Sequence, residues 1–454
     1  MHNDYSQARP ARAVFAGSAL ALAVALALSA PQAAHASAFQ LNENSAQSMG
    51  RAYAGGGAAP NDVSVVVNNP AAMAWFKHGY LQADATAIDF SSHFHGSAVD
   101  ALGQPISGGQ GGNAGGTIPV PAFYYLQPIN DQWVFGMGVS VPFGFKTQYD
   151  PTWVGRYSAI KSEFKSVDAT FSLSYKINDQ WAVGASLIAQ RTSADLTSAV
   201  NFGTILAVPP FNLAPTFLPQ SADGYAQIKG HNWKWGWQAG LSWKPTDRDT
   251  FGLLYHAKIK QNLTGNAYFI VPAQVQTIFA AAQLPLFQNT GGSAEFTTPA
   301  YVNLSYWHQF NDRFSLGAEY NWTQWSTFKN LTVNYANPAQ PASTEVFDWK
   351  NSHFVSVGGD YKLTDALTLR AGIGVDSTPT YQLTRDPRVP DATRRWLSLG
   401  IGYKPVENFV INVGYAHLFV NDAHIHSESP TNDVITGYYT NSANLLAASA
   451  TYRF

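Results

Sequence analysis

The chain has 454 residues and a formal net charge of −2 at pH 7, and only 12% of its residues are charged, against about 25% in soluble domains. Aromatic residues reach 14%, and Cys is absent, which excludes disulfides, a thiol nucleophile and a zinc–thiolate site. No strongly basic region points to nucleic acid, and beyond the N-terminal segment no apolar run reaches the roughly 18 residues of a transmembrane helix. Low charge, many aromatic residues and dispersed hydrophobicity are typical of an outer-membrane β-barrel.

Residues 1–36 have the features of a secretory signal peptide. Arg9 and Arg12 supply the positive end, residues 13–28 form the apolar middle, and Ala34-His35-Ala36 is a small-x-small cleavage site. A membrane anchor is disfavoured because Ala dominates the apolar stretch and a cleavage signature follows it. We therefore expect an exported protein that resides in the outer membrane of a Gram-negative cell.

The segment from residue 37 to residue 78 differs from the strands that follow it. Its Gly55-Gly56-Gly57 run and its Asn69-Pro70 pair favour turns and short irregular pieces over long strands. A flexible periplasmic tail is the alternative, but the apolar content of the segment favours packing. We predict that residues 37–78 form an N-terminal hatch, or plug, inside the lumen of the barrel.

From residue 79 to residue 454 a turn signal recurs between alternating apolar and polar runs. The Ile-Asn-Asp-Gln-Trp sequence of residues 129–133 returns at residues 177–181, and short Asx-rich connections of this kind form hairpin turns. Six short turns separate seven hairpins, which predicts an all-β, fourteen-stranded antiparallel transmembrane β-barrel over residues 79–454. Aromatic residues beside these turns match the girdle expected at a membrane interface. The four related turns are at residues 245–249, 310–314, 363–367 and 404–408.

The strand expected from residue 133 to residue 149 is interrupted by Pro142-Phe143-Gly144. Proline cannot donate to a strand ladder, and the preceding strand also carries prolines, at Pro119 and Pro121. Pairing through the intervening turn places Pro121 and Pro142 at matching heights, roughly 25 Å above the turn. Two interpretations remain open, a lateral gap in the barrel wall or a pair of bulges at its rim.

Two of the longer connections, residues 202–218 and residues 273–287, are unusually apolar. Loops that face solvent should not hold so much apolar surface unless they pack on each other or bind something. We predict that they capture a hydrophobic ligand, and loops that fold over to seal the lumen would be compatible with this role. The candidate contacts are Phe202, Phe211, Phe217, Leu218, Ile278, Phe279, Leu284 and Phe287.

Short motifs spread over almost the whole mature chain resemble those of the FadL/TodX family of outer-membrane transporters for hydrophobic compounds. Each motif is weak alone, but the ordered set is highly specific. The motifs are Phe39-Gln40-Leu41-Asn42-Glu43, Gly50-Arg51-Ala52-Tyr53, Asn69-Pro70-Ala71, Gly236-Trp237-Gln238-Ala239-Gly240, Trp325-Ser326-Thr327-Phe328, Arg370-Ala371-Gly372-Ile373 and Arg395-Trp396-Leu397-Ser398.

The resemblance implies a fourteen-stranded barrel with a hatch and a kinked third strand, the kink corresponding to Pro142-Phe143-Gly144. It also implies passive uptake, in which a ligand lands on the outer loops, enters a lumenal pocket and leaves sideways through the wall. Within the expected hatch, the family motif corresponds to Asn69-Pro70-Ala71, and Phe39 opens the first matching motif. In fatty-acid members basic residues meet the carboxylate. Lys350 matches the pocket lysine and Arg191 approximately matches the pocket arginine, although an ion pair with a hatch carboxylate is an alternative role for both.

Other functions fit the sequence less well. The sequence contains neither a Gly-x-Ser-x-Gly elbow nor a Cys, so no nucleophile motif points to an enzyme. The pairs His93/His95 and His424/His426 each supply half a metal site at best, so neither a metal nor a cofactor is predicted. A general hydrophilic porin would need an open, charged lumen without a plug.

We expect uptake of long-chain fatty acids, with monoaromatic hydrocarbons as the alternative substrate. The protein is expected to be a monomer in contact with outer-membrane lipid and lipopolysaccharide.

Overall fold

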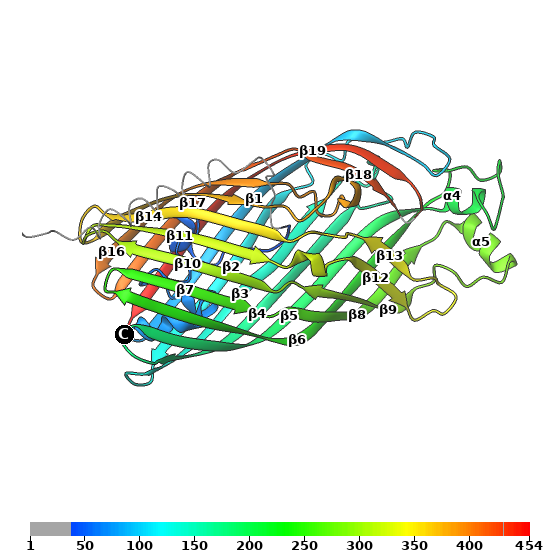
Figure 1. The fold of residues 1–454 in the computed structure, drawn as a ribbon. Coiled ribbons are helices and arrows are strands. Elements are labelled where there is room, and N and C mark those ends of the chain that lie inside the picture. The colour runs from blue at the N-terminus through cyan, green and yellow to red at the C-terminus, as the bar shows by residue number, and fades with distance from the viewer. Residues whose placement is uncertain (1–37, 430) are drawn as a thin grey trace, which may run out of the picture. The chain divides into compact units, whose positions relative to one another are not determined.

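The computed structural model describes residues 38–429 and 431–454, and the predicted signal peptide lies outside the described residues. Nineteen strand segments form one antiparallel sheet, which closes because β1 pairs with β2 on one side and with β19 on the other (Figure 1). The segments are β1 (Tyr80–Val99), β2 (Gly116–Pro128), β3 (Trp133–Gln148), β4 (Lys161–Lys176), β5 (Trp181–Asn201), β6 (Asp223–Thr246), β7 (Asp249–His256), β8 (Ile259–Ile270), β9 (Thr290–Thr298), β10 (Tyr301–Gln309), β11 (Phe314–Thr323), β12 (Asn330–Tyr335), β13 (Ser343–Val346), β14 (Ser352–Lys362), β15 (Leu367–Asp376), β16 (Arg394–Val406), β17 (Phe409–Val420), β18 (Ala423–Glu428) and β19 (Val434–Arg453).

Five barrel strands consist of two segments each. The segments β7 and β8 both pair with β6, and β17 and β18 both pair with β19. The remaining split strands are β9 with β10, β11 with β12, and β13 with β14. In the described part of the chain the nineteen segments therefore form a fourteen-stranded barrel, as predicted.

The six short turns lie where the sequence places them, between β2 and β3, β4 and β5, β6 and β7, β10 and β11, β14 and β15, and β16 and β17. Asn130, Asn178 and Asn311 explain three of them. Each Asn side-chain oxygen accepts hydrogen bonds from the backbone N–H groups two and three residues later, all at 2.9 Å. This local bonding mimics a backbone turn and reverses the chain in four residues.

Alternation along the strands separates an apolar outer face from a polar inner face. In β4, Phe171 and Leu173 are 41% and 42% exposed, whereas Ser172 and Ser174 are buried. Large exposed apolar side chains are expected where a strand faces lipid. Close to the turns the outward residues are aromatic, and the rings of Trp181 and Trp243 stack with centroids 5.2 Å apart across β5 and β6.

Residues 38–78, called here the N-terminal segment, lie inside the barrel toward the end that carries the C-terminus (Figure 1). The segment contains α2 (Ala46–Met49), α3 (Val65–Asn68) and the 3-10 helix η1 (Pro70–Trp75). Val66 and Met73 are completely buried and pack on Tyr124 and Leu126 of β2. The segment therefore packs its apolar side chains against the inner face of the barrel wall.

The long connections extend from the opposite end of the barrel (Figure 1). They carry α4 (Phe202–Ala207) and α5 (Ala273–Ala281), while the 3-10 helices η2 (Trp325–Thr327) and η3 (Gln382–Thr384) lie in other connections. Among the described residues, none of the helices has the length and apolar character needed to cross a membrane.

Candidate functional site

The ladder between β2 and β3 stops part-way along the barrel. Paired residues run from Pro128 and Val134 to Phe123 and Val139, and past that pair the described residues of the two strands are not paired with each other. Pro121 and Pro142 both lie just beyond the last pair. Near Pro142, β3 also shifts its register against β4, between Ser140 and Phe143.

The unpaired stretch extends from there to a point near the outer end of the barrel, where the two segments bond again. There the N–H of Gln148 donates a 2.9 Å hydrogen bond to the carbonyl of Ala114. The wall therefore lacks direct β2–β3 bonds over one bounded interval. The interval combines a missing ladder between β2 and β3 with one register shift of β3 against β4, and β2 keeps its register against β1.

Residues 39–41 of the N-terminal segment lie against β3 at this interval. The N–H of Leu41 donates to the carbonyl of Pro142, and the N–H of Gly144 donates to the carbonyl of Phe39, both at 2.9 Å. Gln40 and Phe143 form the isolated antiparallel bridge between these two bonds. Three residues from inside the lumen thus supply part of the pairing that β2 does not.

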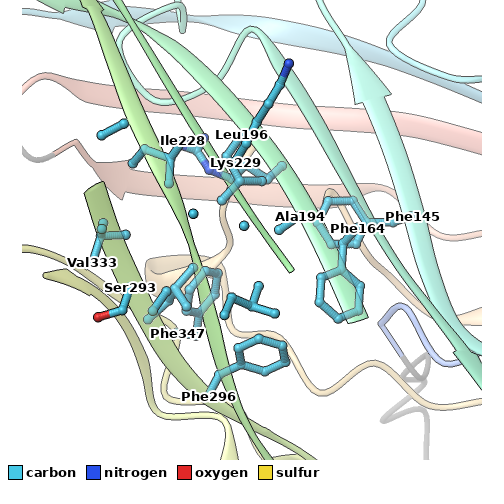
Figure 2. Close-up of a pocket in the computed structure, with 18 of the residues that line it drawn as sticks. Phe145, Phe164, Ala194, Leu196, Ile228, Lys229, Ser293, Phe296, Val333 and Phe347 are labelled. Carbon is cyan, nitrogen blue, oxygen red and sulfur yellow. The ribbon is translucent and has the colours of Figure 1, made fainter. Parts of the chain in front are cut away.

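An apolar cavity of about 850 Å³, called here the lumenal cavity, lies beside this contact. Figure 2 shows Phe164, Phe296 and Phe347 arranged around it, with Ile228 and Leu196 on another side. Its walls come from β3 to β6, β8, β9 and β12, and from the connections that follow β11 and β13. Its mostly aromatic and aliphatic walls make the cavity suited to an apolar small molecule.

The ring of Phe39 lines one end of the lumenal cavity. Its centroid lies 4.7 Å from Trp325, 5.1 Å from Phe164 and 5.6 Å from Trp349. Phe39 itself is only 5% exposed. The N-terminal segment therefore contributes an aromatic side chain to the cavity as well as backbone bonds to β3.

A second cavity of about 780 Å³, called here the wall cavity, lies at the unpaired stretch. It is lined by Ile118 of β2 and by Gly144 of β3, which stand on the two sides of the missing ladder. It shares Phe145 and Val389 with the lumenal cavity. The two cavities are thus neighbours that meet at the kinked part of β3.

Toward the outer end, a vestibule of about 1660 Å³ shares Leu196, Ile228 and Phe347 with the lumenal cavity. A further cavity of about 1150 Å³ under α5 shares Phe269 and Phe287 with the vestibule. Four adjoining cavities therefore follow one another from the outer loops to the interval between β2 and β3.

Arg388, which the sequence did not single out, lines three of these cavities in succession: the vestibule, the lumenal cavity and the wall cavity. Its backbone N–H donates to a carboxylate oxygen of Asp386 at 2.6 Å, and its guanidinium donates to the carbonyl of Ser158. The connection between β15 and β16 that carries it has no periodic pattern that would have announced an inward-facing residue.

At the other end of the N-terminal segment, η1 is fixed against the wall. Asn69 donates to the carbonyls of Gly57 (3.0 Å) and Leu241 (3.2 Å), and its side-chain oxygen accepts from the N–H of Ala71 (3.2 Å). Gly240 lies directly opposite on β6, and a Cβ there would collide with the Asn69 side chain. The Asn69-Pro70-Ala71 motif is therefore anchored by close backbone contact.

A further large cavity lies on the turn side of the N-terminal segment, with a volume of about 1840 Å³. It is lined by charged residues such as Arg313 and Lys362, and by Gln47 and Pro60 of the N-terminal segment. Arg51 of the N-terminal segment is completely buried and forms ion pairs with Asp360 (3.4 Å) and Asp62 (3.9 Å). The N-terminal segment thus borders the turn-side cavity with Gln47 and Pro60 and the wall cavity with Leu41 and Glu43.

The two basic residues suggested by the family resemblance do not line any of these cavities. Arg191 lies on the exposed face of β5 beside Trp233, with its guanidinium carbon 5.9 Å from the Trp ring centroid. The expectation that it meets a lumenal ligand is wrong, because inward residues of β5 have even numbers, such as Gln190. The Nζ of Lys350 lies 5.2 Å from the ring centroid of Tyr381, outside the lining of the cavities described above.

The two apolar loops pack on each other in one cluster. Phe202, Phe217 and Phe279 are buried in this cluster, and Phe211, Ile278 and Phe287 are partly buried against it. Leu218 and Leu284 are 50% and 38% exposed, and both Phe279 and Leu284 line the cavity under α5. Mutual packing thus accounts for much of the apolar surface of the loops, and the ligand-contact role of these eight residues stays a prediction.

The histidine pairs lie at the outer rim of the barrel. His95 and His424 both lie beside Tyr438, since β1 and β18 pair with β19 at that residue. Their ring centroids are 5.1 and 5.8 Å from that of Tyr438. Among the described residues no group of three or more metal-ligating side chains could hold a metal ion.

Comparison with known proteins shows which family this chain matches. A family model described as outer membrane protein transport protein (OMPP1/FadL/TodX) matches residues 27–454. Outer membrane protein P1 of Haemophilus influenzae is 28% identical over 95% of this chain and 98% of its own length, and the long-chain fatty acid transport protein of Salmonella typhi is 27% identical over 88% and 91%. The crystal structure of a Pseudomonas aeruginosa FadL homologue matches with a TM-score of 0.87 and 34% identity over 92% and 100% of the chains.

The toluene transporter TbuX of Ralstonia pickettii shares the fold, with a TM-score of 0.65 and 19% identity over 91% of this chain and 99% of that chain. The family model and these relatives thus match nearly the whole mature sequence, which includes the turns, the barrel strands and the motifs that suggested the resemblance. The chain belongs to the OMPP1/FadL/TodX family of outer-membrane transport proteins.

Proposed function

We propose that this protein takes up hydrophobic compounds passively across the outer membrane and releases them sideways between β2 and β3. The observation that carries the proposal is the wall cavity, because Ile118 and Gly144 line it from the two sides of the missing ladder. Within a membrane, unpaired backbone is tolerated only where protein or a cavity covers it. An unpaired stretch backed by an apolar cavity is suited to pass an oily molecule into the bilayer.

Uptake in this mechanism follows the four adjoining cavities. A ligand first contacts the cluster around Phe279 and Leu284, then enters the vestibule, and reaches the lumenal cavity beside Phe347. Phe39 must leave its end of the lumenal cavity before the ligand reaches the wall cavity. The last transfer, from the lumenal cavity to the wall cavity, exchanges one mostly apolar surface for another, so it does not require the ligand to enter water.

The N-terminal segment acts in this proposal as a hatch with one fixed end and one mobile end. Its fixed end is the Asn69-Pro70-Ala71 motif, whose buried bonds hold it to β6. Its mobile end is Phe39-Gln40-Leu41, held to β3 by the two backbone bonds described above. A hatch of this kind frees the wall cavity without clearing the lumen, so water and small solutes remain excluded.

The substrate that fits the cavities best is a long-chain fatty acid. Apolar walls accommodate the hydrocarbon chain, and Arg388 offers one cation to a carboxylate in three successive cavities. The long-chain fatty acid transport protein of Salmonella typhi is similar over most of its length, which supports the same substrate class. A monoaromatic hydrocarbon, the alternative, would make no use of that guanidinium.

The proposal is tested in cells that lack other uptake systems for long-chain fatty acids. Production of this protein should raise the uptake of labelled oleate severalfold, and excess toluene should compete poorly. Liposomes containing the purified protein should swell slowly in small sugars. Robust swelling would indicate a hydrophilic porin, while efficient toluene uptake without oleate uptake would assign the protein to the monoaromatic class.

A further inference from the structure

The outward face of the barrel changes from apolar to basic at one level on β4, β5 and β6. One row of paired residues is Phe171, Leu187 and Trp237, exposed to 41%, 51% and 52%. Arg191 lies four residues beyond Leu187 on β5, closer to the outer end, and is paired with Trp233 of β6. The apolar band thus ends at this row.

The next row toward the outer end of the barrel adds a lysine and a histidine. It consists of Lys165, Ser193 and His231, again paired across the three strands. Arg191 lies ten residues beyond Trp181, the aromatic residue at the turn end of β5. That distance corresponds to roughly 25 Å along the membrane normal, which is the height of the apolar band of an outer-membrane barrel.

Acidic residues lie only further out, where lysines already pair with them. Asp195 bonds to Lys161 at 2.9 Å and contacts Lys229 at 3.8 Å, and Glu163 contacts Lys161 at 3.5 Å. In the part of the chain that the structure describes, neither Lys165 nor Arg191 forms an ion pair within 4.0 Å. Arg191 lies over Trp233 instead.

The opposite side of the barrel offers a contrast. Arg395 of β16 is exposed at the outer part of its strand, and its partners on the neighbouring strands are Val375 and Phe419. These two side chains are 42% and 52% exposed. Arg395 is therefore a single cation between apolar neighbours, whereas β4 to β6 present a cluster.

We propose that Lys165, Arg191 and His231, called here the basic patch, bind the phosphate groups of lipopolysaccharide in the outer leaflet. Clustered cations at the level of the headgroups attract anionic lipid. Below them, Trp237 and Leu187 offer an apolar surface for the acyl chains. Trp rings between a charged and an apolar zone suit a lipid interface, since they are amphipathic.

The basic patch lies beside the kinked strand. Lys165 of β4 is paired in register with Gly144 of β3, and Gly144 lines the wall cavity. A lipid held at the basic patch would thus stand one strand away from the unpaired interval. The binding site itself follows from the charges and the exposed rings and does not depend on the proposed transport route.

The test compares the natural protein with the triple variant Lys165→Ala/Arg191→Ala/His231→Ala and with Arg395→Ala as the matched control. Each protein is purified in detergent, and binding of bisphosphorylated lipid A is measured by native mass spectrometry. The triple variant should bind about thirty-fold more weakly, since Lys165 and Arg191 each contribute about 1 kcal/mol near an anionic surface. The Arg395→Ala variant should bind like the natural protein.

Two further probes separate the contribution of the phosphate groups to binding from that of hydrophobic contact with the acyl chains. Dephosphorylated lipid A should bind equally weakly to all three proteins, and inorganic phosphate alone should not compete. Equal binding of bisphosphorylated lipid A to the natural protein and the triple variant would overturn the proposal, and so would undiminished binding of the dephosphorylated lipid. Heat-modifiable electrophoretic mobility and oleate uptake verify that the triple variant is folded.

Discussion

The backbone N–H of Leu41 donates a 2.9 Å hydrogen bond to the carbonyl of Pro142. This bond joins the mobile end of the proposed hatch to the strand whose ladder with β2 is missing. Together with the bond from Gly144 to Phe39, it allows the N-terminal segment to cover the interval from inside. The closed state of the wall is therefore made by two short pieces of chain that are about 100 residues apart.

A disulfide between these pieces should stop transport. Gln40 and Phe143 are bridge partners between two wide-spaced hydrogen bonds, a geometry in which the Cα atoms are about 4.5 Å apart, within the range of a disulfide. The double variant Gln40→Cys/Phe143→Cys should lose most oleate uptake when oxidised and regain it with a reductant. The chain has no natural Cys, so the single variants are clean controls. Undiminished uptake by the oxidised protein would refute movement of the hatch.

Removal of the Phe39 ring should raise the affinity of the lumenal cavity for ligand. The ring lines the cavity beside Phe164 and Trp325, and the proposed route displaces it as the ligand binds, which lowers the apparent affinity. Phe39→Ala should therefore bind oleate more tightly in a fluorescence-displacement titration. In contrast, Phe328→Ala removes a wall of the same cavity and should weaken binding. Weaker binding by both variants would show that Phe39 is part of the binding surface.

Substitution of Arg388 should weaken binding of acids selectively. Hydrogen bonds to charged groups contribute about 1.5–3 kcal/mol, so Arg388→Met should lower oleate affinity by about ten-fold or more, with little effect on oleyl alcohol. Isothermal titration with the two ligands measures the difference. Lys350→Met is the matched control, because Lys350 lies outside the cavity linings. A larger loss of oleate affinity in that control would restore Lys350 as the carboxylate contact.

The stability of the protein should depend on pH through Glu43, which lines the wall cavity. Burial is the largest cause that raises the pKa of this carboxyl from 4.5 to about 7, while Arg394 lowers it and Asp376 raises it. A raised pKa favours the protonated folded state, so this contribution is complete below pH 4.5 and is lost as the pH rises through about 7.

The variant Glu43→Gln keeps a neutral side chain at every pH. It should be more stable than the natural protein at pH 8, by up to about 3 kcal/mol, and nearly equal to it at pH 4. Urea unfolding followed by Trp fluorescence at the two pH values checks the sign. Equal destabilisation at both would show that Glu43 is ionised throughout.

Loss of the Asn69 side chain should detach the fixed end of the hatch and leave the barrel intact. In Asn69→Ala the carbonyls of Gly57 and Leu241 lose their donor, and the bond to Gly57 is buried, where a group left unsatisfied costs about 1–3 kcal/mol. We expect a normal heat-modifiable barrel that admits small sugars in liposome swelling. Unchanged swelling would mean that other contacts of α3 and η1 hold the segment in place.

The barrel could be predicted from the sequence because its signals are local. Each Asn-centred turn is decided by hydrogen bonds within four residues, as at Asn130 and Asn178, and the alternation in β4 follows from the pleat. Pro142 marks the level of the missing ladder for the same reason, since a residue without an N–H weakens pairing wherever it lies.

The ligand contacts could not be predicted in this way. Arg191 was placed in the lumen by an approximate motif match, and a shift of one residue moves a strand side chain to the other face. Arg388 lies in an irregular connection whose path is determined by tertiary contacts such as its bond to Ser158. A bond between residues 230 positions apart in the chain has no local signal in the sequence.

The completely buried Arg51, with its ion pairs to Asp62 and Asp360, has a consequence for the cell. On the proposed lateral route the ligand leaves into the bilayer and does not pass Arg51, so the contacts around Arg51 can stay intact through every cycle of transport. Bacteria could then keep many copies in the envelope at all times without admitting hydrophilic antibiotics. Net inflow would be driven only by consumption of the imported nutrient further inside.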